Sequence, residues 1–220
     1  MTPDPRDAAL LHVCPCVAVP RYGDLPKGEF GQRILVASNG VFLEVRRSWL
    51  NCLVQISELP CTPAIPYGVL TERISFTFGV IPVALVKEFI VAGREGLPNE
   101  VAGALIYDRT ANTLRLAVHD AVVAGPAEVR YRMPVLRMCE ELVVDLHTHG
   151  RLPAFWSATD DADDQGVKVC GVFGELHRDA PTAEFRLAIN GAFWELPHPF
   201  STARPTWIAT CFMESDTWNT

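Results

Sequence analysis

Apolar and polar positions alternate with a period of two along much of the chain, a pattern typical of half-buried strands. In the first third of the chain, the predicted strands cover residues 33–37, 41–47 and 50–56. The first two are joined at Asn39-Gly40, a dipeptide that favours a tight hairpin turn. We therefore expect residues 1–72 to form a small β-rich N-terminal region.

The periodicity becomes helical in the next region, residues 73–200. Pro82 suits the first turn of a helix, apolar side chains then recur every three or four positions, and Gly96 with Pro98 ends the pattern. Strand patterns follow at residues 101–107, 113–119, 128–133, 142–146, 167–176, 185–189 and 192–196. These elements predict an α/β fold, a curved and mostly antiparallel sheet flanked by helices, followed by a C-terminal tail at residues 201–220.

Composition indicates a soluble protein of the cytoplasm. With 220 residues, 49% of them hydrophobic, the chain can bury one good core and a small second one. No apolar stretch approaches the roughly 20 residues needed to span a bilayer. The N-terminus lacks the basic start and apolar centre of a secretory signal. The seven cysteines form no Cys-x-x-Cys pairs, which argues against a disulfide framework.

The net charge of −7 argues against nucleic-acid binding, because phosphate contacts need clustered lysine and arginine. Part of the negative charge lies in the run Asp160–Asp164, which resembles the start of a calcium loop. Such a loop needs a bidentate Glu at its twelfth position, where this chain has Val172. We therefore expect no calcium there, and place the carboxylates in the first turn of a helix instead.

The strongest chemical signal is the sequence HTHGRLPAFWSATD, in which His147 and His149 are followed by Ser157 and Asp160. Residues two apart on a strand point to the same side, so both imidazoles can face one metal ion at the end of the strand 142–146. Zn²⁺ takes nitrogen and oxygen donors, and a catalytic site uses three protein ligands. Taken singly, a histidine near a strand end is usually structural, and Ser-x-x-acid is also a helix cap. The two roles of Asp160 are compatible.

This pattern resembles the JAMM (JAB/MPN) metallopeptidases, in which a Glu precedes His-x-His, seven residues and Ser-x-x-Asp. Glu100, at the start of the predicted strand 101–107, matches the position of the family's catalytic Glu. The resemblance covers about residues 75–197 and implies the same α/β fold. Gly150 stands where relatives often have Pro. The sequence AFWSATDDADD and the N-terminal region also resemble one bacterial branch of this family, protein A of the PRTRC cassette.

The resemblance implies a zinc peptidase that hydrolyses an amide or isopeptide bond at the C-terminus of a ubiquitin-like protein. His147, His149 and Asp160 would bind Zn²⁺, and Glu100 would act as general base for the zinc-bound water. Ser157 would donate a hydrogen bond to the oxyanion. The implied partners are a β-grasp modifier and an E1-like adenylating protein.

Two alternatives remain open from the sequence. One is a non-catalytic scaffold of the same fold, and the other is a peptidase that processes the C-terminus of a sulfur carrier. The oligomeric state and the role of the N-terminal region are not encoded in any motif.

Overall fold

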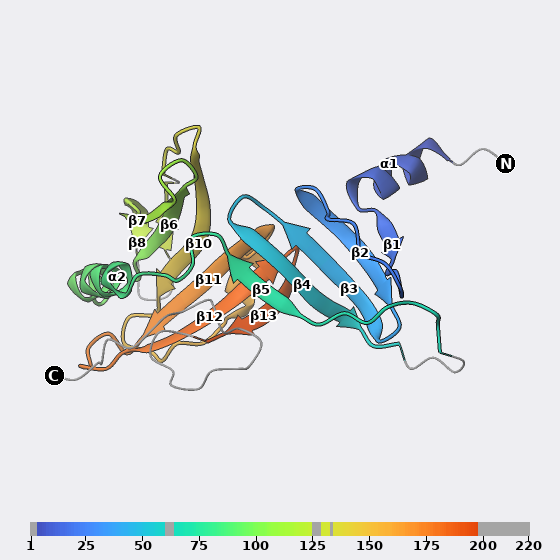
Figure 1. Cartoon of the computed structure of the whole chain (residues 1–220). Helices are drawn as coiled ribbons and strands as arrows, with labels where there is room; N and C mark the ends of the chain where they lie inside the picture. Colours follow the sequence, from blue (N-terminus) through green and yellow to red (C-terminus); the bar gives the residue numbers. More distant parts are fainter. Residues whose placement is uncertain (1–3, 60–63, 125–128, 133, 198–220) are drawn as a thin grey trace. The chain divides into compact units, whose positions relative to one another are not determined.

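The computed structural model describes residues 4–59, 64–124, 129–132 and 134–197. Its described residues form two compact units, the first ending at Thr77 and the second beginning at Phe78 (Figure 1). The expected C-terminal tail, residues 201–220, lies outside the described part, as do positions 128 and 133 of one predicted strand. No helix in the described part is long and apolar enough to cross a membrane.

The first unit is a five-stranded sheet preceded by a helix, α1 (Pro5–Val13). Its strands, in their order across the sheet, are β1 (Cys16–Ala18), β2 (Gly31–Ala37), β3 (Gly40–Arg46), β4 (Leu50–Ser57) and β5 (Arg73–Phe76). Strands β1 and β2 pair in parallel, and the others are antiparallel. The β-rich character expected of this region is therefore observed.

Helix α1 was not predicted, although its start carries a recognisable signal. The Asp4 carboxylate accepts a hydrogen bond from the Arg6 backbone N–H at 2.8 Å, and Pro5 occupies the first helical position. An acidic cap followed by Pro is typical of a helix start. The helix buries none of its residues, so it lacks the amphipathic pattern by which helices are usually found.

The second unit contains a six-stranded sheet. Its strands, in spatial order, are β13 (Ala192–Leu196), β12 (Thr182–Ile189), β11 (Val167–Gly174), β10 (Glu140–Thr148), β6 (Ala102–Asp108) and β7 (Thr113–Val118). Only the central pair β10–β11 is parallel. In a separate two-stranded sheet, β8 (Ala121–Ala124) pairs antiparallel with β9 (Val129–Tyr131). The mixed, mostly antiparallel α/β fold expected from the sequence is confirmed.

Two helices accompany this sheet, α2 (Val83–Gly96) and α3 (Ala158–Asp163). Helix α2 buries Val86, Phe89 and Ile90, the face predicted from periodicity. Gly93 allows close packing, since a Cβ there would lie 3.0 Å from the Thr148 methyl group. Helix α2 therefore packs against the carboxyl end of β10.

Candidate metal centre

Strand β10 lies in the middle of the sheet and carries the His-x-His sequence at its end. His147 is opposite Ala102 of the antiparallel strand β6 and Val172 of the parallel strand β11. In an antiparallel pair, the start of one strand lies beside the end of its neighbour. Glu100, two residues before β6 begins, is thereby brought to the end of β10 where the histidines lie.

Thr148, between the two histidines, fixes this junction. Its side-chain oxygen accepts a hydrogen bond from the Val101 N–H at 2.9 Å, and its own N–H donates to the Val101 carbonyl at 3.0 Å. The side chain is fully buried, and its methyl group lies against Gly93 of α2. No role was predicted for Thr148 from the sequence. The feature that could have indicated one is its position, as a small, polar, β-branched residue between two histidines.

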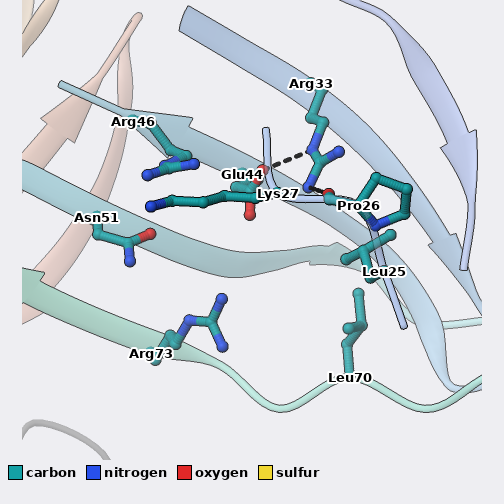
Figure 2. A pocket seen from close by; sticks show the side chains of 9 residues that line it. All are labelled: Leu25, Pro26, Lys27, Arg33, Glu44, Arg46, Asn51, Leu70 and Arg73. Atoms are coloured by element: carbon teal, nitrogen blue, oxygen red, sulfur yellow. Dashed lines mark hydrogen bonds and ion pairs between the residues drawn. The ribbon is translucent and has the colours of Figure 1, made fainter. Parts of the chain in front are cut away.

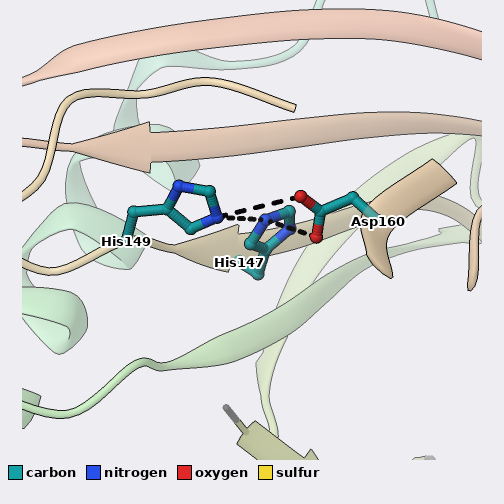
Figure 3. A group of neighbouring side chains, drawn as sticks. All are labelled: His147, His149 and Asp160. Atoms are coloured by element: carbon teal, nitrogen blue, oxygen red, sulfur yellow. Dashed lines mark hydrogen bonds and ion pairs between the residues drawn. The ribbon is translucent and has the colours of Figure 1, made fainter. Parts of the chain in front are cut away.

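The three expected metal ligands converge (Figure 3). His147 Nε2 lies 3.2 Å from His149 Nε2 and 3.2 Å from Asp160 Oδ1. The distance from His149 Nε2 to Asp160 Oδ2 is 3.9 Å. Ligands about 2.0–2.1 Å from a tetrahedral Zn²⁺ would be roughly 3.3–3.4 Å apart. The spacing of these donor atoms therefore fits a metal ion of that size.

The local electrostatics favour the protonation state that a metal requires. Burial lowers the pKa of His147 and, together with the neighbouring His147, that of His149, although Asp160 opposes both shifts. Imidazole binds a metal only in its neutral form. Burial, followed by the negative charge of Asp160, raises the pKa of Glu100 to about 7. The influence of Asp160 agrees with the position of Glu100 next to the ligand group.

Ser157 and Asp160 form a capping box at the start of α3. The Asp160 N–H donates to Ser157 Oγ at 3.2 Å, and the Ser157 N–H donates to Asp160 Oδ2 at 2.7 Å. The Ser157 hydroxyl also donates to Asp160 Oδ2 at 2.6 Å. The helix cap therefore leaves Asp160 able to serve as a metal ligand, because Oδ1 is the atom closest to His147.

Gly150, which follows the second histidine, has a φ of +57°. Proline is fixed near −65°, so the Pro often found here in related sequences could not adopt this turn. The backbone continues with hydrogen bonds from Leu176 N–H to the Gly150 carbonyl, at 2.9 Å, and from His149 N–H to the Phe173 carbonyl, at 2.7 Å. The positive φ therefore favours glycine at this position, because glycine adopts it without strain.

Residues 82–188 match the family model described as prokaryotic homologs of the JAB domain. This match supports a JAB-like domain in this part of the chain. Residues 4–77 match a different model, a domain of unknown function (DUF2016). The DUF2016 match ends at Thr77, where the first structural unit also ends.

Among solved structures, the chain is similar to the solution structure of protein DSY2949 from Desulfitobacterium hafniense. The two share 16% sequence identity with a TM-score of 0.42, over 53% of this chain and 88% of that chain. No curated protein matches the chain significantly.

Charged side chains connect helix α3 of the second unit to its six-stranded sheet. Lys168 of β11 binds Asp145 of β10 at 2.8 Å and Asp164 at 3.1 Å. Arg186 of β12 binds Asp161 at 2.6 Å and Asp164 at 2.7 Å. Lys168 is therefore the ion-pair partner of Asp145, beside the histidines on β10. These ion pairs hold the helix that carries Asp160 against the strands that position the histidines.

Aromatic rings complete the surroundings of the ligand group. The ring of Phe155 lies 4.4 Å from that of His149, and the ring of Trp156 lies 6.1 Å from that of His147. The Arg186 guanidinium lies 3.9 Å from the ring centre of Trp156 and 3.8 Å from that of Phe193. Trp156 therefore contacts both His147, a candidate metal ligand, and the arginine that binds α3.

Proposed function

We propose that the JAB domain is a zinc-dependent peptidase of the JAMM type, which hydrolyses an amide or isopeptide bond at the C-terminus of a ubiquitin-like protein. The observation that carries this proposal is the spacing of His147 Nε2, His149 Nε2 and the Asp160 carboxylate, with Glu100 brought beside them by the β6–β10 pairing. A structural metal site would not require a fourth residue, the partly buried Glu100, with a second carboxylate at the same place.

In this mechanism, His147, His149 and Asp160 hold the metal ion. When bound, Zn²⁺ supplies Lewis acidity, which polarises a carbonyl and makes water acidic near neutral pH. Glu100 takes the proton from the attacking water and returns it to the leaving amine. Ser157 keeps Asp160 oriented and, by turning its hydroxyl, could donate to the oxyanion.

The substrate class follows from the resemblance and is compatible with the shape of the domain. The two edge strands of the described six-stranded sheet are β7 and β13, and an extended C-terminal tail could pair with such an edge. The rings of Phe155 and Trp156 beside the histidines favour a tail with small residues near the scissile bond. We further propose a β-grasp modifier and an E1-like adenylating protein as partners, as in the PRTRC branch.

The test combines zinc content with cleavage. We expect about one zinc per chain by mass spectrometry, and its loss in His147→Ala. The probe for activity is ubiquitin carrying a fluorogenic amide at its C-terminus, together with a β-grasp protein fused through its C-terminal Gly-Gly to a reporter. Glu100→Gln should keep the zinc but reduce cleavage by about 10²-fold or more, because it cannot accept a proton.

The outcomes separate the alternatives. Zinc without cleavage of either probe would favour a non-catalytic scaffold, and cleavage that survives Glu100→Gln would exclude Glu100 as the base. Cleavage of a short sulfur-carrier precursor, but of neither fusion, would favour sulfur-carrier processing. No zinc in the wild-type chain, even when zinc is supplied under reducing conditions, would contradict the proposal as a whole.

A further inference from the structure

One face of the sheet in the first unit is divided into an apolar half and a charged half. The apolar half is a buried cluster of Val19, Leu35, Ala37, Phe42 and Leu53. Strand register and side-chain alternation place the following polar residues on the same face: Arg33, Glu44, Arg46, Asn51 and Arg73. A sheet face that would normally be covered by apolar side chains is therefore strongly polar over half its length.

A pocket of about 370 Å³ lies over this charged half (Figure 2). All five of these polar residues line it, and Lys27 joins them from the segment that precedes β2. Leu25 and Leu70, which also pack against the apolar cluster, form its other end. Figure 2 shows the ends of Lys27, Arg46 and Arg73 near Asn51, away from the two leucines. The pocket is thus cationic at one end and apolar at the other.

Hydrogen bonds hold the segment that carries Lys27 in place. Arg33 donates to the Pro26 carbonyl at 2.8 Å, and Arg46 donates to the Gly28 carbonyl. The carbonyls on both sides of Lys27 are therefore bound by arginines of the sheet. This arrangement fixes the backbone of Lys27 over the pocket.

The positive charge of the pocket is largely uncompensated. Glu44 is the only acidic residue among the described ones that line the pocket, and Arg33 binds it at 2.5 Å. Among the described residues, Lys27, Arg46 and Arg73 have no carboxylate partner. Residues 1–77 contain seven basic and seven acidic side chains, so this group of cations is not a consequence of local composition.

Asn51 provides an independent indication of a ligand. Its side-chain oxygen is buried and has no hydrogen-bond partner in the described part of the chain. Buried polar atoms are nearly always hydrogen-bonded, and those that are not call for an explanation. A hydroxyl or amine donor on a ligand would satisfy it once the Asn51 amide turns toward the pocket that this residue lines.

We propose that this pocket binds a small organic phosphate. The phosphate lies between Lys27, Arg46 and Arg73, where guanidinium groups can donate paired hydrogen bonds to its oxygens. Three cationic side chains without a carboxylate partner match the charge of a dianionic phosphate better than that of a single carboxylate. The rest of the ligand carries a hydroxyl toward Asn51 and extends toward the apolar end. The volume lies within the range of about 300–1,000 Å³ that is typical of small-molecule sites.

The experiment is calorimetric titration of the full chain with ribose 5-phosphate, pyrophosphate and ribose. We expect both phosphates to bind and ribose not to bind. The double variant Lys27→Gln/Arg73→Gln should weaken phosphate binding by about tenfold or more, because it removes two charged donors. The matched control is Arg21→Gln/Arg47→Gln, which removes the same charge from the same unit but not from the pocket and should bind like the wild type.

Two further arms make the result decisive. The titrations are repeated with the His147→Ala variant, since phosphate bound at a metal centre would be lost there, whereas binding in this pocket would persist. Asn51→Leu tests the ligand hydroxyl and should weaken ribose 5-phosphate more than pyrophosphate. Equal weakening by both double variants, absence of binding, or binding of a single-stranded oligonucleotide but not of ribose 5-phosphate would overturn the proposal.

Discussion

Ser157 affects the proposed metal centre through Asp160, because its hydroxyl and its backbone N–H both donate to Asp160 Oδ2. These bonds fix the carboxylate so that Oδ1 faces His147. Removing an outer partner of this kind typically weakens metal affinity about 10–100-fold. We therefore predict that Ser157→Ala raises the zinc Kd by about that factor, measured by competition with a chromophoric chelator.

Ser157→Thr is the matched control, since it keeps the hydroxyl and a residue favoured at helix N-caps. It should restore most of the zinc affinity. If Ser157→Ala instead left zinc affinity unchanged and lowered kcat alone, the hydroxyl would act mainly on the substrate, as the sequence suggested. The two measurements thus assign the role of this residue.

At the scale of elements, the attachment of α3 depends on Arg186. The helix has six residues and buries none of them, so apolar packing contributes little to its position. Arg186, with a side chain only 5% exposed, binds Asp161 and Asp164 and stacks on Trp156. Removing one partner of a buried ion pair typically costs about 3–5 kcal/mol, because the other charge is left buried.

We predict that Arg186→Met lowers the free energy of unfolding of the second unit by about 3 kcal/mol in urea titrations. The double variant Arg186→Met/Asp164→Asn should recover part of this loss, because it no longer buries an unpaired carboxylate. An Arg186→Met variant that unfolds like the wild type would show that α3 is held by other contacts. If the double variant is no more stable than the single one, stacking on the aromatic rings is the larger contribution.

The elements differ in how well the sequence predicted them. The hairpin at Asn39-Gly40, helix α2 and the strand before His147 have strong local periodicity or turn signals, and the structure contains them. The ligand group was predictable because its spacing is local to one strand and one helix start. The Lys168–Asp145 and Arg186–Asp164 ion pairs were not, because each joins residues more than twenty positions apart through sheet pairing. The proposed phosphate pocket was not predictable either, because its lining residues come together only through the register of four strands.

At the scale of the whole molecule, the two proposed sites lie in different units. The phosphate pocket is formed by residues before Thr77, and the metal ligands all follow Phe78. A ligand stabilises the unit that it binds, by about 2.7 kcal/mol when its concentration is 100 times its Kd. Coupling between the sites would require contacts that change when either ligand binds.

We therefore predict that zinc slows hydrogen exchange in peptides from β6, β10 and α3 and leaves peptides from β2, β3 and β4 unchanged. Hydrogen exchange followed by mass spectrometry measures both units in one sample. In His147→Ala the zinc effect should disappear from all peptides, which controls for weak binding to the exposed acidic residues. If zinc slowed exchange in β2–β4 of the wild type to the same extent, the units would unfold as one cooperative structure. Metal binding would then also stabilise the N-terminal sheet, and it would change the affinity of the phosphate pocket for its ligand.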